Sequence, residues 1–175
     1  MVCDLDGTLV RLGVDWDAVR VCLRRLVGAR AGGVAQLLRR ARAAGLRAEA
    51  EAVVERAELD AAGRCEVNEA LLALLAAVPA RVPVAVCSAN GRRPVGRALA
   101  RAGLDGRVAA VVGREDVERG KPAPDGLLAL LDRFGARRAR TVLVGDSELD
   151  ERAAAAARVR FVDVAAVGVR WRSLA

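Results

Sequence analysis

Short apolar runs alternate with helical segments through the second half of the chain, and this alternation constrains the fold more than any other feature. The runs are typical of strands buried in a parallel sheet, and they lie at Val82–Cys87, Val108–Val112, Thr141–Val144 and Phe161–Val164. Proline or acidic residues mark the first turns of the helices predicted between them, at Pro94–Ala102, Pro124–Phe134 and Glu148–Arg158. With Met1–Cys3 as a short first strand, the pattern predicts a doubly wound parallel α/β sheet.

The interval between the first strand and this alternating region has a different pattern. From Val14 to Val78 there is no strand signal, and apolar residues recur at helical spacing, as in the stripe Trp16, Val19, Leu23 and Leu26. Glycines punctuate the interval, so we predict four helices, the last of which, Glu66–Val78, belongs to the layer that covers the sheet. The predicted domains are a core of residues 1–13 and 66–175 and a small all-helical cap of residues 14–65, inserted after the first strand.

The charge of the chain is strongly basic, at +7 over 175 residues. Arginines are scattered through the helical segments, and aromatic residues, which stack bases in single-strand binders, make up only 2% of the chain. We therefore interpret the arginines as a solvated face and do not expect nucleic acid as the partner. Of the 29 basic residues only Lys121 is a lysine, which marks it as a candidate for chemistry that arginine cannot perform.

The cysteines and the hydropathy of the chain indicate the compartment. The four cysteines are widely spaced and the chain has no histidine, so a zinc site is not expected. Free thiols are typical of a reducing compartment. No run of about 18 apolar residues is present, and the first residues do not resemble an export leader. We expect a cytoplasmic protein that does not enter the membrane.

The loop Asp4-Leu5-Asp6-Gly7-Thr8-Leu9 follows the first strand and places two carboxylates two residues apart, before a glycine. At the carboxyl end of a central parallel strand, such a loop lies in the crevice where α/β sheets bind ligands. The glycine lets the chain turn sharply, so that both carboxylates can reach the same spot. The alternative is an ordinary surface turn, in which Asp and Gly are common.

Three more motifs follow in order at predicted loops and strand ends. They are Cys87-Ser88-Ala89-Asn90, Gly120-Lys121-Pro122 and Gly145-Asp146-Ser147-Glu148-Leu149-Asp150. Together with the first loop, they resemble the four motifs of the haloacid dehalogenase-like (HAD) hydrolases, in the phosphoglycolate phosphatase-like branch that carries a helical cap after the first motif. The resemblance covers most of Met1 to Val164 and implies a Rossmann-like core.

The resemblance assigns roles to the motif residues. It implies that Asp4 is the nucleophile, that Asp6 is the general acid and base, and that Lys121 supplies fixed positive charge. It implies Mg²⁺ as cofactor, and oxygen ligands from Asp4 and Asp146 suit this hard cation. The expected metal residues are Asp4, Asp6 (through its carbonyl), Asp146 and Asp150, with Asp150 acting either as a ligand or by orienting the others. The expected phosphate-binding residues are Thr8, Ser88, Ala89, Asn90 and Lys121.

The activity implied is Mg²⁺-dependent hydrolysis of a small phosphorylated metabolite through an aspartyl-phosphate. Asp6 favours phosphoryl transfer over dehalogenation, because a halide leaving group needs no proton. Three alternatives stay open: a noncatalytic arginine-rich protein that binds nucleic acid, a phosphomutase, and a regulatory phosphatase acting on proteins. The insert is expected to close over the site. Arg11, between core and insert, is a further candidate for contact with an anionic substrate.

Overall fold

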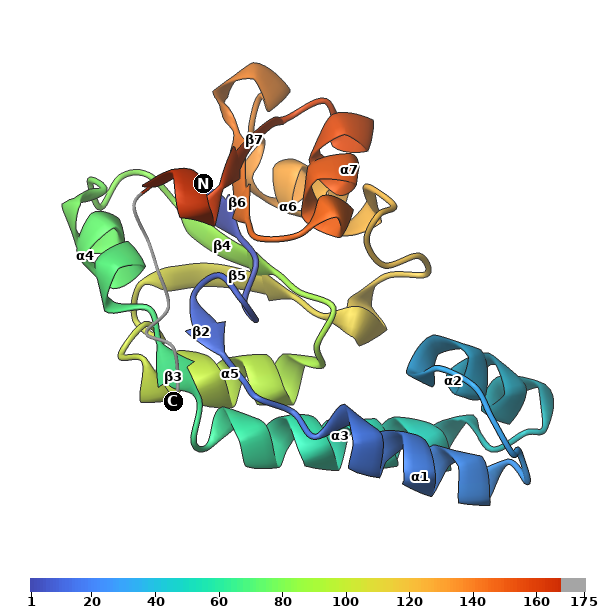
Figure 1. Ribbon diagram of the computed structural model, residues 1–175. Helices are drawn as coiled ribbons and strands as arrows, with labels where there is room; N and C mark the ends of the chain where they lie inside the picture. The colour runs from blue at the N-terminus through green and yellow to red at the C-terminus, as the bar shows by residue number, and fades with distance from the viewer. Residues whose placement is uncertain (168–175) are drawn as a thin grey trace.

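The computed structural model describes residues 1–167, and at its centre lies a five-stranded sheet (Figure 1). The strands are β1 (Val2–Cys3), β4 (Val84–Cys87), β5 (Val108–Val112), β6 (Val142–Gly145) and β7 (Arg160–Asp163). All pairings are parallel, in the order β5-β4-β1-β6-β7. The prediction of a doubly wound α/β sheet is confirmed. Although β1 has only two residues, it is paired on both sides, with Val2 opposite Ala85 and Leu143.

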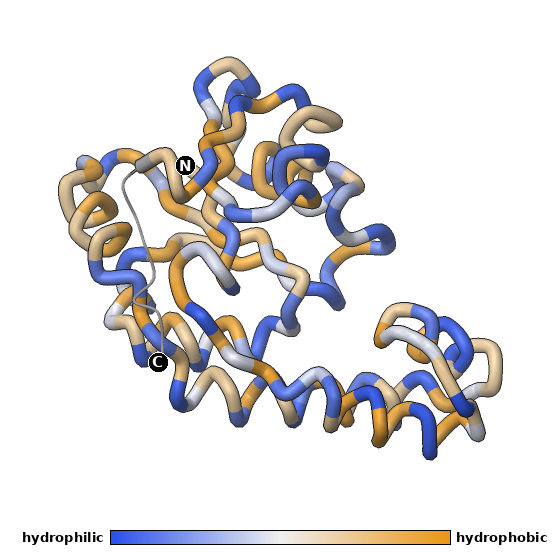
Figure 2. The backbone as a smooth tube through the Cα atoms, in the orientation of Figure 1, coloured by the Kyte–Doolittle hydropathy of each residue, from blue (hydrophilic) through white to orange (hydrophobic). Residues whose placement is uncertain are grey.

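Helices cover both faces of the sheet, because both faces are apolar. Successive side chains of β4 point to opposite faces, and each set is buried. Val84 and Val86 point into one apolar cluster, with side chains of α4 (Glu69–Ala77) and α5 (Arg92–Arg101). Ala85 and Cys87 point into the other, with side chains of α6 (Asp125–Phe134) and α7 (Glu148–Ala157). Figure 2 shows the apolar residues gathered along this central region. Three short 3₁₀ turns complete the core, at Arg114–Asp116, Arg138–Arg140 and Val164–Val167.

The insert after β1 contains three helices: α1 (Trp16–Leu26), α2 (Val34–Ala43) and α3 (Arg47–Ala62). They enclose an apolar cluster of their own, which includes Val19, Leu23 and Leu37. Helix α3 takes part in two clusters: Ala50 and Val54 belong to the insert, whereas Ala61 and Ala62 pack with the sheet-side core. In Figure 1 the three helices project to one side of the sheet, joined to it through α3. The domain limits at residues 14 and 65 stay a prediction.

The start of the predicted helix Glu66–Val78, which follows the insert, was wrong. Residues Glu66–Val67 form strand β3 instead of starting a helix, and they pair antiparallel with β2 (Val10–Arg11). The helix begins at Glu69 because the Asn68 side chain accepts a hydrogen bond from the backbone N–H of Leu71 and so caps α4. Glu66 and Val67, which precede the cap, therefore lie outside the helix and adopt the extended backbone of β3.

The other boundaries differ from the predicted ones by a few residues. Helix α5 begins at Arg92, two residues before Pro94, because the first N–H groups of a helix have no partner within it and a proline there removes no hydrogen bond. Within residues 1–167, no helix has the length and apolar character needed to cross a membrane.

Candidate active site

The strand order places two acidic loops side by side. The chain runs from β1 outward through β4 to β5 and then returns to the other side of β1 with β6, so the order reverses between β1 and β6. Ligands of open α/β sheets bind at the carboxyl ends of the strands on either side of such a reversal. Asp4 follows β1 and Asp146 follows β6, and the Asp4 N–H donates to the carbonyl of Val144 at 2.8 Å.

The loop after β1 approaches the loop after β6 so closely that it requires a glycine. The carbonyl of Leu5 accepts hydrogen bonds from the N–H groups of Leu9 and Val10, which folds the loop into a tight turn. Gly7 has φ +88°, and a Cβ built on it would lie 2.0 Å from Asp146 Oδ2. Any side chain at this position would displace the Asp146 carboxylate.

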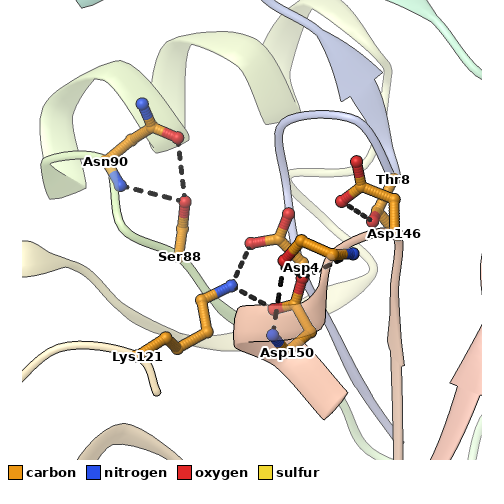
Figure 3. Close-up of polar contacts among 8 residues, drawn as sticks. Asp4, Thr8, Ser88, Asn90, Lys121, Asp146 and Asp150 are labelled. Atoms are coloured by element: carbon orange, nitrogen blue, oxygen red, sulfur yellow. Dashed lines mark hydrogen bonds and ion pairs between the residues drawn. The ribbon is translucent and has the colours of Figure 1, made fainter. Parts of the chain in front are cut away.

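Lys121 and two carboxylates form the charged centre of the site (Figure 3). Lys121 Nζ lies 2.5 Å from Asp4 Oδ1 and 2.5 Å from Asp150 Oδ1, and the side chains of Lys121, Asp4 and Asp150 are only 8%, 8% and 1% exposed. One carboxylate oxygen from each of Asp4, Asp146 and Asp150 lies within 4.8 Å of the others. The structure therefore brings these four predicted residues together.

Burial is the largest single influence on the pKa of each of these groups, and neighbouring charges act beside it. It raises the pKa of Asp4 to about 7, with the Lys121 charge acting in the opposite direction and the Asp150 charge adding to the rise. Burial also raises the pKa of Asp6. A hydrogen bond from the Leu12 N–H to Asp6 Oδ1, at 2.8 Å, lowers this pKa but does not cancel the rise. Burial alone would lower the pKa of Lys121, but the carboxylates of Asp4 and Asp150 outweigh it and the pKa is raised.

Two hydroxyl side chains act on neighbouring carboxylates, Thr8, which was predicted to bind phosphate, and Ser147. The Thr8 side chain is fully buried, and its hydroxyl donates to Asp146 Oδ1 at 3.3 Å, so it orients that carboxylate. Ser147 caps α7 and accepts a hydrogen bond from the Asp150 N–H at 3.3 Å. Its hydroxyl in turn donates to Asp150 Oδ2, which fixes the Asp150 side chain at the start of the helix.

The loop after β4 is held by its own hydrogen bonds. Ser88 Oγ donates to Asn90 Oδ1 at 3.0 Å and accepts from the Asn90 N–H at 3.1 Å (Figure 3). Ala89 and Asn90 line the same cavity as Asp4 and Lys121, whereas Ser88 lies just beneath it, in the buried base of the loop. The cavity has a volume of about 470 Å³, within the usual range for small-molecule sites.

Two charged residues of the cavity lining were not predicted, Glu58 of the insert and Arg114 of the core. Arg114 forms a bidentate ion pair with Glu58, at 2.7 and 3.1 Å. The Glu58 carboxylate also accepts from Asn90 Nδ2 and from the Gly91 N–H, each at 3.1 Å. A signal for Glu58 exists in the sequence, since it follows Val54 by four residues on the apolar face of α3. Arg114 follows the end of β5, where ligands gather.

Arg11, the candidate at the junction, is engaged elsewhere. Its guanidinium lies 4.0 Å from the carboxylate of Glu66, across the β2–β3 pair, and it does not line the cavity.

Comparison with known proteins identifies the family. The profile of the haloacid dehalogenase-like hydrolases matches residues 47–164. The chain belongs to this family. The match begins after the first acidic loop, so the place of Asp4 in the site comes from the structure. The HAD resemblance predicted from four short motifs is confirmed.

Individual relatives of this HAD chain agree with that assignment. A phosphoglycolate phosphatase of Rhodospirillum rubrum is 38% identical over 92 residues, which are 52% of this chain but only 38% of that protein. The chain thus matches less than half of that relative's length. Among solved structures, a HAD-superfamily hydrolase of subfamily IA from Geobacter sulfurreducens has a TM-score of 0.69 and 24% identity, covering 93% of this chain and 86% of its own. CbbY from Rhodobacter sphaeroides, in complex with phosphate, has a TM-score of 0.71 and 20% identity, covering 93% and 84%. These structures support the fold.

Proposed function

We propose that the chain is a phosphatase that hydrolyses a small phosphate monoester, with Asp4 as nucleophile. The observation that carries the proposal is the convergence of Asp4, Lys121, Asp146 and Asp150 on one cavity at the point where the strand order reverses. Membership of a hydrolase family and the relative named as a phosphoglycolate phosphatase support the activity class.

The acidic cluster fits a divalent cation. Its donors are hard carboxylate oxygens, which are the ligands that Mg²⁺ prefers. Asp4, the carbonyl of Asp6 and Asp146 would hold the ion, with Asp150 either joining them or orienting Lys121 and Asp4. When bound, Mg²⁺ would neutralise negative charge on the phosphoryl group and on the nucleophile, which otherwise repel each other.

The first step transfers the phosphoryl group to the protein. An oxygen of Asp4 attacks phosphorus, a bond forms between them, and the bond from phosphorus to the ester oxygen breaks. Asp6 gives its proton to the leaving oxygen, a role that suits a carboxyl whose pKa is raised by burial. Lys121 holds positive charge beside Asp4 throughout, because the two flanking carboxylates keep it protonated.

The second step releases phosphate. Asp6, now ionised, accepts a proton from a water molecule that attacks the aspartyl-phosphate, and the bond between phosphorus and Asp4 breaks. Ala89 and Asn90 line the cavity that Asp4 and Lys121 also line, where they could contact the phosphoryl group, and Ser88 holds Asn90 through two hydrogen bonds. The acid and the nucleophile are thereby restored for the next turnover.

Part of the basic charge of the described chain is engaged in ion pairs. Eight arginines of the described chain form ion pairs with acidic side chains: Arg11, Arg20, Arg47, Arg92, Arg93, Arg114, Arg119 and Arg152. This pairing fits a solvated surface, as predicted from the sequence, and reduces the charge offered to a polynucleotide.

The test is release of inorganic phosphate from a panel of small esters, phosphoglycolate among them, with Mg²⁺ or with a chelator. We expect turnover only with Mg²⁺, and a fall to the background rate in Asp4→Asn. Asp105→Asn, which changes an exposed aspartate outside the site, is the matched control and should retain full activity. Isomerised ester without free phosphate would identify a phosphomutase. No turnover by the folded protein on any ester would contradict the proposal and favour a binding protein.

A further inference from the structure

The insert supplies an apolar wall to the cavity. Three of its helices contribute the lining side chains Trp16, Val34, Ala35, Leu38 and Val54. Asp4, Asp6 and Lys121, where the reaction would occur, lie on the core side. The organic part of a bound ester would therefore meet mainly hydrocarbon and the Trp16 ring on this side, where the polar side chain of Glu58 is held in its ion pair with Arg114.

The cations of this cavity are already neutralised. Among the described residues that line it, the positive side chains are Lys121 and Arg114. Lys121 contacts two carboxylates, and Arg114 is held by the 1% exposed Glu58 through two hydrogen bonds. Because an arginine–carboxylate fork satisfies both partners, Arg114 offers no uncompensated charge to a ligand.

These two observations determine which leaving groups the cavity favours. A carboxylate or second phosphate on the organic part would lose its water in a cavity whose described lining has five acidic side chains, Asp4, Asp6, Glu58, Asp146 and Asp150, and whose two cations are both already paired. A hydrocarbon group would instead gain the free energy of leaving water.

We infer that the alcohol released by this enzyme is neutral and largely apolar, an alkyl or aryl alcohol, and that Leu38 and Trp16 select it. The inference rests on the phosphatase activity proposed above. It assigns Arg114 and Glu58 a neutral, closed pairing in place of an anion-binding role.

The experiment compares two esters that differ by one charge. Benzyl phosphate and 4-carboxybenzyl phosphate react at the same kind of oxygen, and acetyl phosphate reports on the phosphoryl site alone. We expect kcat/KM for benzyl phosphate to exceed that for its carboxylated partner by about tenfold or more, which is the usual scale for a mismatched polar group in an apolar pocket. Equal or faster turnover of the carboxylated ester, with acetyl phosphate hydrolysed, would overturn this inference and leave the phosphatase activity standing. Failure on acetyl phosphate as well would overturn both.

Two variants locate the selectivity. Leu38→Ala should lower kcat/KM for benzyl phosphate by about tenfold, while acetyl phosphate changes less than about twofold. Val21→Ala removes an apolar side chain that is exposed on α1 outside the cavity, and it should change neither substrate. Glu58→Gln, which leaves Arg114 with a net positive charge, should shift the ratio of the two benzyl esters about tenfold towards the carboxylated one. Parallel losses on all three substrates in Leu38→Ala, or an unchanged ratio in Glu58→Gln, would contradict the assignment.

Discussion

The ionised form of Asp4, which is the form that attacks phosphorus, lowers the stability of the folded protein. Its carboxylate is buried beside the carboxylate of Asp150, with one lysine between them, so the three charges sum to a net negative charge. A group whose pKa is raised on folding is most favourable when protonated, and the folded protein loses stability as pH rises from the ordinary value towards the raised one.

We therefore expect Asp4→Asn to be more stable than the natural protein when metal is absent, and the difference to depend on pH. With an ordinary carboxyl pKa near ~3.9 and a folded pKa of about 7, the advantage of Asn should grow between these two values and stay constant above them. It should reach about 1 kcal/mol or more at pH 8. Thermal unfolding at pH 5 and pH 8 with chelator measures it. An advantage that is the same at both values would contradict this account, and Asp105→Asn serves as the control.

At the residue scale, the sequence predicted most of the site. Asp4, Lys121, Asp146 and Asp150, which come from three of the four motifs, converge because they lie in segments that leave the carboxyl ends of β1, β5 and β6 at the same edge of the sheet. Glu58 was missed because its position on the apolar face of α3 indicates burial but does not identify the groups that it contacts. Its partners lie 32 to 56 residues away, and only the tertiary structure brings them to it.

Asn68 connects two elements that the sequence could not place together. It caps α4 through the Leu71 N–H, and its side-chain amide donates to the carbonyl of Thr8 at 2.8 Å, within the buried base of the acidic loop. Strand β3, which was not predicted, ends one residue before it and pairs with the strand that follows the loop. A two-residue strand is too short to produce a pattern in the sequence, so only its partner defines it.

Loss of the Asn68 side chain should destabilise the folded protein. We expect Asn68→Ala to lower the free energy of unfolding by about 1–3 kcal/mol, since it removes a helix cap and leaves a buried carbonyl without its donor. Asp15→Ala provides the comparison: Asp15 caps α1 through the Ala18 N–H but is exposed, so its loss should cost less, about 0.5–1 kcal/mol. Urea unfolding of both variants gives the two values, and equal costs would show that the bond to Thr8 contributes nothing.

At the scale of the whole molecule, the reactivity of the cysteines measures how often the core opens to solvent. Cys22 is exposed on the insert, whereas Cys3, Cys65 and Cys87 are buried in the core. Burial raises the pKa of Cys3 to about 12 and that of Cys87 to about 11, so both remain protonated and unreactive in the native state. The two lie in the clusters on opposite faces of the sheet, so together they monitor both layers.

A thiol reagent at pH 8 should therefore modify one cysteine per chain quickly and the other three only as the core opens. Mass spectrometry over time gives the count, and Cys22→Ser should remove the fast phase and leave the slow ones unchanged. Rapid modification of two or more thiols in the native protein would show that one face of the sheet is open to solvent.

Helix α3 has a mechanical consequence for the insert. Its amino-terminal half packs with α1 and α2, its carboxyl-terminal half packs with the core, and it continues without interruption from Arg47 to Ala62. A continuous helix resists bending, so it acts as a beam fixed at both ends. The other connection between core and insert is a single segment of the chain, which passes through Gly13 with φ +65°. The insert is thus connected to the core by one rigid helix. Its small movements should be rotations about the α3 axis and not a hinge opening away from the core.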